Sequence, residues 1–203
     1  MVGNSCLCEL GVSPANDSSV RFSQGGTSVV VAIHGPLEFR SQGPAGLIID
    51  VSVRIPSGIP GPAERSIEDV ARIIIQECVD SNAFHSRTLV VSIDVLDDNG
   101  SLLSVVANGI ALVLLESGLP LTTVATASTH LASFGKESAQ RTVQVVVCSK
   151  TGKLLYGCVN GIGGRCSALS HIYQDAMTEG DARRRTLLDE LITHTKASAR
   201  CPW

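Results

Sequence analysis

A short polar loop, "DDNGS" at residues 97–101, carries the residue types that point most directly to chemistry. It follows the β-rich run "VVSID" and precedes a long apolar run. A strand, a glycine turn and the start of a helix together present free backbone N–H groups, which bind phosphate and other anions. The residues at the mouth of the helix are Ser101, Leu102 and Leu103, so no lysine or arginine is placed to hold a phosphate. The sequence predicts the backbone of an anion site without its cations.

Carboxylates beside this loop suggest a second kind of chemistry. Asp94, Asp97 and Asp98 cluster in sequence and offer the oxygen ligands that Mg²⁺ prefers. Turn formation and negative charge at a helix start are their simpler roles. From residue 99 to residue 174 the chain has no aspartate and only two glutamates. Reactions on phosphodiesters usually need a carboxylate pair, so half of the fold lacks the required groups.

Metal and nucleophile motifs are missing from the sequence. The seven cysteines include no Cys-x-x-Cys pair, and no Gly-x-Ser-x-Gly elbow occurs. Cys148 and Cys158 lie in apolar runs, which is typical of buried structural thiols. The glycine-rich run at residues 161–165 lacks the βα context of a dinucleotide site. We therefore expect no metal and no cofactor.

Composition limits the class of protein. The 203 residues suffice for one substantial core, and we expect a single domain over residues 1–203. A net charge of −3 and an aromatic content of 3% argue against a strongly basic or base-stacking nucleic-acid binder. The odd cysteine count and the polar first residues favour reduced, intracellular thiols. The longest apolar stretch, at residues 102–115, is shorter than the roughly 20 residues that span a bilayer, so no membrane partner is expected.

Hydrophobic periodicity predicts the elements that position these residues. An amphipathic helix is expected at 66–81 with Ser66 as its N-cap, and a buried helix at 101–117 that ends at Gly118. Five runs are typical of strands: 27–33, 47–55, 88–96, 143–148 and 154–159. A third helical pattern covers about 167–196. The element order is β-β-β-α-β-α-β-β-β-α. This order predicts an α/β fold, an α+β sandwich with helices against a mixed sheet.

In this order, the segments resemble the RNase PH family, and more closely the RNase PH-fold subunits that form the ring of the eukaryotic RNA exosome. The similar segments are 25–40, 58–79 and 85–121. In the last, "HSRT", "VLDDNGSLL", "AN" and "ESGLPL" resemble the His-Pro-Arg, Asp-x-Gly-Ser, Leu-Asn-Ala and Asp-Ala-Gly-Ile-Pro signatures of ring subunits. The Asp-x-Gly-Ser-Leu-Leu form narrows the resemblance to one of these subunits. The resemblance implies an RNase PH-like fold of the ribosomal protein S5 domain 2 type. The match is loose after Ser133, and the Arg-x-Asp-Gly-Arg opening of many relatives is absent.

The resemblance also implies that the phosphate-binding and catalytic residues of the family are missing from this chain. Active members hold phosphate in a Gly-Gly-Thr-Arg loop, and the equivalent here is a degenerate site formed by Asn99, Gly100, Ser101 and Leu102. The position of a second phosphate arginine matches Gly61-Pro62, and the family's aspartate pair falls in the interval without aspartates. The expectation is a chain without catalytic residues: a structural ring subunit that supports 3′-to-5′ RNA processing and degradation, including rRNA maturation.

Partners and location follow from the same resemblance. We expect the other RNase PH-like ring subunits, cap proteins with S1 and KH domains, and single-stranded RNA in the ring channel, in the nucleus, nucleolus and cytoplasm. Arg40, Arg54 and Arg65 are candidate RNA contacts. For Arg54 and Arg65, a solvated surface residue or an inter-subunit salt bridge is the simpler role. Self-association of the isolated chain is left open.

Two alternatives are retained. One is an active 3′-to-5′ exoribonuclease, phosphorolytic or hydrolytic, with a rearranged site around the three aspartates. The other keeps only the superfold, which ribosomal proteins and small-molecule kinases also use, since a fold alone does not fix function. A kinase-type phosphate loop with a basic residue is absent from the sequence.

Overall fold

The computed structural model describes residues 6–38, 46–56, 61–84, 86–133, 140–148 and 150–160, with single residues and pairs between 174 and 193. The predicted helix at 167–196 lies mostly outside the described residues. Those that are described within it are helical.

The strands of the described part form two sheets. The larger sheet has the order β1-β2-β3-β5-β4, and the smaller has the order β6-β7-β8. All neighbouring strands are antiparallel except β4 and β5, which are parallel. The large sheet consists of β1 (Cys6–Leu10), β2 (Ser18–Gln24), β3 (Thr27–Glu38), β4 (Leu47–Arg54) and β5 (Arg87–Asp97). The small sheet consists of β6 (Ala125–Ser133), β7 (Gln140–Cys148) and β8 (Leu154–Asn160). The predicted mixed sheet is confirmed.

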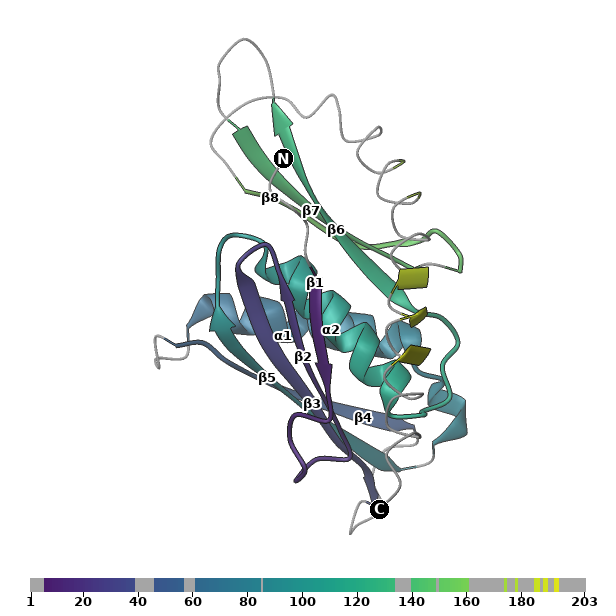
Figure 1. The fold of residues 1–203 in the computed structure, drawn as a ribbon. Coiled ribbons are helices and arrows are strands. Elements are labelled where there is room, and N and C mark those ends of the chain that lie inside the picture. Colours follow the sequence, from purple (N-terminus) through teal and green to yellow (C-terminus); the bar gives the residue numbers. More distant parts are fainter. Residues whose placement is uncertain are drawn as a thin grey trace.

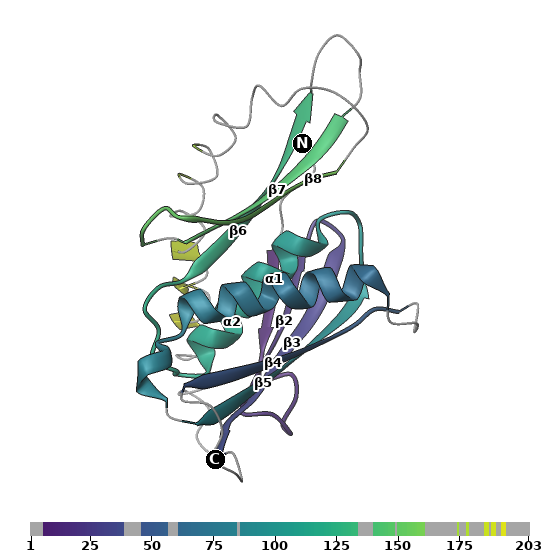
Figure 2. The same cartoon turned by 180° about the vertical axis from the view of Figure 1, so that it is seen from behind.

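Two helices, α1 (Pro62–Cys78) and α2 (Leu102–Glu116), cover one face of the large sheet (Figures 1 and 2). A short 3-10 turn, η1 (Ser81–Ala83), follows α1. Helix α2 packs on β2 and β3 and meets β6 and β7 of the small sheet on its other side, whereas α1 packs on β4 and touches β8. None of the helices in the described ranges has the length and hydropathy needed to cross a bilayer. The result is a sandwich in which α2 is the shared middle element.

Burial follows the predicted alternation of residues. In β4, Ile49, Val51 and Val53 are buried while the residues between them face solvent. Helix α2 differs, because all of its residues from Ser104 to Leu114 are buried. It approaches β3 so closely that a side chain at Gly109 would begin 3.0 Å from the Val31 Cγ2 atom. The helix that is apolar nearly all round is therefore the centre of the core, as predicted.

Asn108 joins α2 to the small sheet. Its Nδ2 donates to the carbonyl of Ala127 in β6 (3.0 Å), and its Oδ1 accepts the N–H of the same residue (2.9 Å). Strand β6 is the outer strand of its sheet, so these two groups face away from the ladder to β7. Asn108 is fully buried. One amide side chain therefore pairs both edge-facing backbone groups of Ala127.

The start of α1 corrects one prediction. The helix begins at Pro62 with Gly61 as N-cap, so Ser66 is not the cap, and its hydroxyl instead donates to the Pro62 carbonyl (3.0 Å). Proline suits the first helical position because its fixed φ fits and its missing N–H costs nothing there. Glu64 turns back to accept the N–H of Gly61 (2.6 Å). These two residues set the start four positions earlier than the hydrophobic pattern indicated.

The number of strands is a second correction. Four strands precede α1 where three were predicted, and β1, β2 and β6 did not appear among the predicted ranges. Strands β2, "SSVRFSQ", and β6, "ATASTHLAS", are rich in small polar residues. Pairing with a neighbouring strand, rather than intrinsic propensity, makes these segments extended.

We expect Asn108→Ala to lower the free energy of unfolding by about 3 kcal/mol, because it leaves two buried backbone groups of Ala127 without partners. Urea denaturation followed by circular dichroism measures the change. Ser66→Ala is the matched control, since it removes an exposed helical hydroxyl and should stay within about 0.5 kcal/mol. Equal stability of the two variants would contradict the role assigned to Asn108.

Candidate functional site

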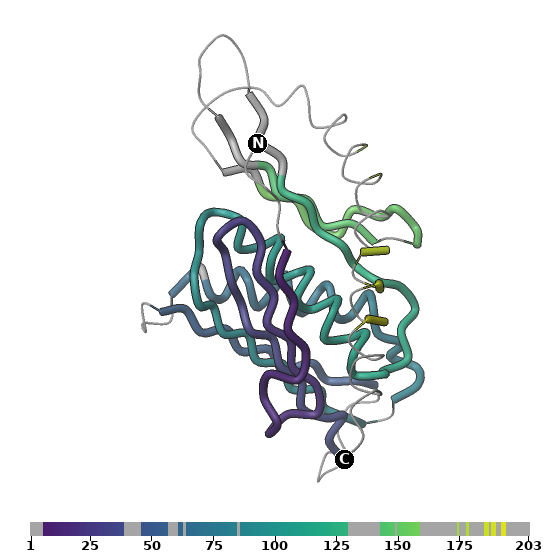
Figure 3. The backbone as a smooth tube through the Cα atoms, viewed as in Figure 1, coloured from purple at the N-terminus to yellow at the C-terminus, as the bar shows by residue number. Residues whose placement is uncertain are grey.

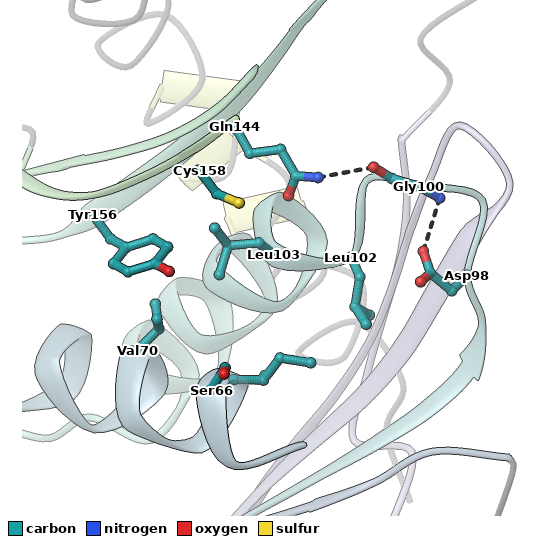
Figure 4. Close-up of a pocket in the computed structure, with 10 residues that line it drawn as sticks. Ser66, Val70, Asp98, Gly100, Leu102, Leu103, Gln144, Tyr156 and Cys158 are labelled. Carbon is teal, nitrogen blue, oxygen red and sulfur yellow. Dashed lines mark hydrogen bonds between the residues drawn. The ribbon is translucent and has the colours of Figure 1, made fainter. Parts of the chain in front are cut away.

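A pocket of about 300 Å³ lies between the first turns of α1, the loop before α2 and strands β7 and β8 (Figure 4). Its walls are mainly apolar, and they include one carboxylate and one carboxamide. The lining residues are Ser66, Ile67, Val70, Asp98, Gly100, Leu102, Leu103, Gln144, Tyr156 and Cys158. None of these described lining residues is a lysine, arginine or histidine. The pocket contains the predicted loop and is the candidate functional site.

The loop itself has the predicted layout. Strand β5 ends at Asp97, the turn follows, and α2 begins at Leu102. The Asp98 carboxylate accepts the N–H of Gly100 (2.8 Å), and Gly100 has a φ of 87°, which suits a glycine. Strand, glycine turn and helix are therefore confirmed as backbone. That this backbone is a degenerate phosphate site stays a prediction.

The polar groups of the loop are held by the turn between β2 and β3. The N–H of Asn99 donates to the Thr27 hydroxyl (2.9 Å), and its side-chain amide donates to the Gly25 carbonyl (3.3 Å). The Ser101 hydroxyl donates to the same Thr27 oxygen (3.0 Å). Thr27 is fully buried. Two of the four residues of the degenerate site, Asn99 and Ser101, are thus committed to internal hydrogen bonds.

Gln144 of β7 reaches the first turn of α2. Its Oε1 accepts the N–H of Ser104 (3.2 Å), and its Nε2 donates to the Gly100 carbonyl (2.8 Å; Figure 4). The Ser104 hydroxyl accepts a hydrogen bond from Thr129 (2.7 Å). Gln144 is only 2% exposed. A neutral side chain of the protein therefore accepts a hydrogen bond from one of the first N–H groups of α2, which have no partner within the helix.

The three aspartates near the loop do not converge. Asp94 lies on the sheet face away from the helices and pairs with Arg54 (Nε to Oδ1, 3.3 Å). Asp97 and Asp98 are exposed, and only Asp98 lines the pocket. Across the described ranges, no group of three His, Cys, Asp or Glu residues is placed to hold a metal ion. In the described part of the chain, the three aspartates therefore do not share one site.

The candidate RNA contacts are not gathered at the pocket. Arg40 lies outside the described residues. Arg54 is exposed and paired with Asp94 of the same chain, and Arg65 is exposed on the first turn of α1. Neither lines the pocket. Contact of these arginines with RNA stays a prediction.

The position expected for a second phosphate arginine has become a helix start. Gly61 is the N-cap of α1, and its N–H is bound by Glu64, which is only 6% exposed. Pro62 has no N–H to offer a ligand. In this structure the position forms the start of α1, and its equivalence to a phosphate arginine stays a prediction.

Among the described residues, the pKa shifts fall on the Asp17 carboxyl and on two thiols, all outside the pocket. Burial raises the pKa of the Cys78 thiol to about 12, so this thiol stays protonated at neutral pH. Burial also raises the pKa of Cys148, but hydrogen bonds from Thr123 and from the turn at Lys150 and Thr151 outweigh it, and the net pKa is lowered. Cys148 is buried, as predicted, whereas Cys158 is only partly buried and lines the pocket.

Sequence reasoning missed the far wall of the site. Gln144, Tyr156 and Cys158 come from β7 and β8, more than 40 residues after the loop. Gln144 shares a strand face with Val146 and Cys148, which are both buried, so its position in the strand marks it as inward-facing. No local signal marks its partner, because the contact depends on how the small sheet lies across α2.

The comparisons with known proteins agree with this geometry. The RNase PH model, described as the 3′ exoribonuclease family, domain 1, matches residues 5–120. The chain belongs to this family. Among solved structures, rice (Oryza sativa) Rrp46 has a TM-score of 0.76 at 20% identity, covering 91% of this chain and 95% of that chain. An Archaeoglobus fulgidus exosome with RNA bound to the active site has a TM-score of 0.72 at 18% identity, covering 90% and 88%. The RNase PH-like fold is confirmed.

Curated relatives match over a shorter stretch. Exosome complex component rrp46 of Schizosaccharomyces pombe is 26% identical over 115 residues, which is 55% of this chain and 51% of that protein. The RRP46 homolog of Caenorhabditis elegans is 26% identical over 119 residues, 58% and 55% of the two chains. The chain spans about half the length of these relatives. The loop motif resembled one ring subunit in particular, ribosomal RNA-processing protein forty-six. Both of these relatives are named after that subunit. The single domain over residues 1–203 stays a prediction.

We expect Thr27→Val to lower the free energy of unfolding by about 1–3 kcal/mol, because two hydrogen bonds from the loop lose their acceptor. Hydrogen exchange at the Asn99 amide should accelerate as well. Thr126→Val is the matched control. Thr126 is also fully buried in a strand, yet its hydroxyl has no hydrogen-bond partner in the described part of the chain. That variant should be unchanged or slightly more stable, and a loss equal to that of Thr27→Val would show that the loop bonds contribute nothing specific.

Proposed function

We propose that this chain is a structural, non-catalytic subunit of an RNA exosome ring, which supports 3′-to-5′ processing and degradation of RNA, including rRNA maturation. The observation that carries the proposal is the pocket at the start of α2. It has the backbone of an anion site, but its described lining has no basic residue, and its polar groups are bonded within the protein. The likeness to exosome components of two organisms supports the same function.

The electrostatics of the pocket argue against phosphorolysis. A phosphate must exchange its hydration for charge-assisted hydrogen bonds, which contribute about 1.5–3 kcal/mol each. Leu102 and Leu103 supply none, and the only charged group in the described lining, Asp98, repels an anion. Hydrolysis with Mg²⁺ is disfavoured for a different reason, since the single carboxylate of the described lining cannot by itself form a two-metal or acid–base pair.

The edges of the sheets support a role in assembly. Strand β1 is an outer strand of the large sheet, and Leu7 on it is 68% exposed. An outer strand with an exposed apolar side chain is a place where another chain can pack. We propose other RNase PH-like ring subunits as neighbours, S1 and KH cap proteins above the ring, and single-stranded RNA in the channel. The proposed locations are the nucleus, nucleolus and cytoplasm, and the arginines Arg40, Arg54 and Arg65 are proposed RNA contacts.

The assembly proposal predicts a stable complex. The full chain, co-expressed with each RNase PH-fold subunit of the same organism, should co-purify with at least one of them. Native mass spectrometry and multi-angle light scattering measure the composition and mass. A chain that stays monomeric with every such subunit would contradict the proposed function.

A residual exoribonuclease is the second candidate, and the observation that favours it is Asp98, a carboxylate that lines the pocket. We expect the purified chain to release no nucleotides from end-labelled RNA, with phosphate or with Mg²⁺, and Asp98→Ala to leave this unchanged. Asp69→Ala is the control, because Asp69 is an exposed carboxylate on α1 that pairs with Arg72. Release that is lost in Asp98→Ala and kept in Asp69→Ala would establish the enzyme instead.

A further inference from the structure

We propose that Gln144 closes the anion site of this chain from within, by placing its carboxamide where an anion would bind at the start of α2. The inference rests on the proposed loss of phosphate chemistry, but not on assembly into a ring. The missing cations are then one cause of the lost anion binding, and Gln144 is a second. Because the carboxamide occupies the binding position, adding a cation alone would not restore anion binding.

The contacts of Gln144 fit this role at both ends of the carboxamide. The oxygen accepts the N–H of Ser104, the third residue of α2, and the nitrogen donates to the carbonyl of Gly100 in the turn (3.2 and 2.8 Å). The first N–H groups of a helix have no partner within the helix and carry its partial positive charge. Gln144 meets that need with a lone pair from a neutral group, and at 2% exposure it excludes water from the bond.

Strand pairing holds Gln144 in place. It lies opposite Thr129 of β6 and Cys158 of β8 in the small sheet. The Thr129 hydroxyl donates a hydrogen bond to the Ser104 hydroxyl (2.7 Å), so two neighbouring strands both bond Ser104 of α2. An anion at this place would have to break the two buried bonds of Gln144 before making its own. Such a loss weakens binding by on the order of a hundredfold.

The arrangement predicts a dependence between two positions. Leu102 is the first residue of α2, partly exposed, and lines the pocket. An arginine there would bring a guanidinium to the helix start, where it can bond an oxyanion. With Gln144 in place, that arginine meets a filled site. With Gln144 shortened, the same arginine and the freed N–H of Ser104 act together.

The test uses the full chain and four proteins: the parent, Leu102→Arg, Gln144→Thr, and the double variant. Threonine keeps the strand preference of the position and shortens the side chain. Inorganic phosphate is titrated to about 50 mM while the amide shifts of residues 102–104 are followed by NMR. We expect no saturable shift in the parent or in Leu102→Arg. The double variant should bind phosphate at least about tenfold more tightly than either of these two proteins. Leu102→Arg binding as tightly as the double variant would overturn the proposal.

Two further measurements keep the proposal open to refutation. Thr129→Val combined with Leu102→Arg removes the neighbouring hydrogen bond but leaves Gln144, so it should behave like Leu102→Arg alone. If Gln144→Thr does not fold, hydrogen exchange in the parent decides. The Ser104 amide should exchange at least about tenfold more slowly than the amide of Leu102, and equal rates would overturn the proposal. Failure of either test leaves the ring-assembly experiment unaffected, so the two ideas can be separated.

Discussion

Burial of α2 between two sheets is the constraint on which the rest of the structure depends. A helix without a solvent-exposed face has no water to hydrogen-bond its polar groups, so each of these groups needs a partner within the protein. Asn108 bonds the edge of β6, and Ser104 bonds Gln144 and Thr129. At the other end, Glu116 accepts hydrogen bonds from the Ser18 hydroxyl and the Ser19 N–H of β2. The polar side chains of α2 thus form hydrogen bonds that link the helix to both sheets.

The same constraint accounts for the strand, turn and helix geometry in front of α2. The turn at residues 98–101 must deliver the chain from β5 into α2 at a fixed place, because α2 cannot shift without disturbing the close contact at Gly109. The geometry of strand, turn and helix is therefore required by the core, whatever binds at its mouth. Side chains such as Leu102 project into the pocket and are free of that requirement. The side chains in front of the helix can therefore vary while the backbone geometry stays.

The parts that were predictable from sequence are those determined by local pattern. The apolar run of α2 and the alternation in β4 and β5 each mark one segment without reference to another, and the turn at Gly100 is marked by residue type. Strands β2 and β6 could not be recognised, because their small polar residues become strands through pairing with β3 and β7. The start of α1 was misplaced because Pro62 and Glu64 outweigh Ser66. Gln144 was missed because its role exists only when β7 lies across α2.

Asp98 and Gln144 together do for this helix start what a bound anion does elsewhere. The Asp98 carboxylate supplies negative charge beside the positive end of α2 while it accepts the Gly100 N–H, and Gln144 supplies a lone pair to the Ser104 N–H. A site that binds phosphate must leave both needs unmet in the free protein, which costs stability. If the chain has the proposed structural role, it has no reason to keep that cost. On that proposal, the loss of phosphate binding and the contact between α2 and the small sheet are consequences of the same side chains.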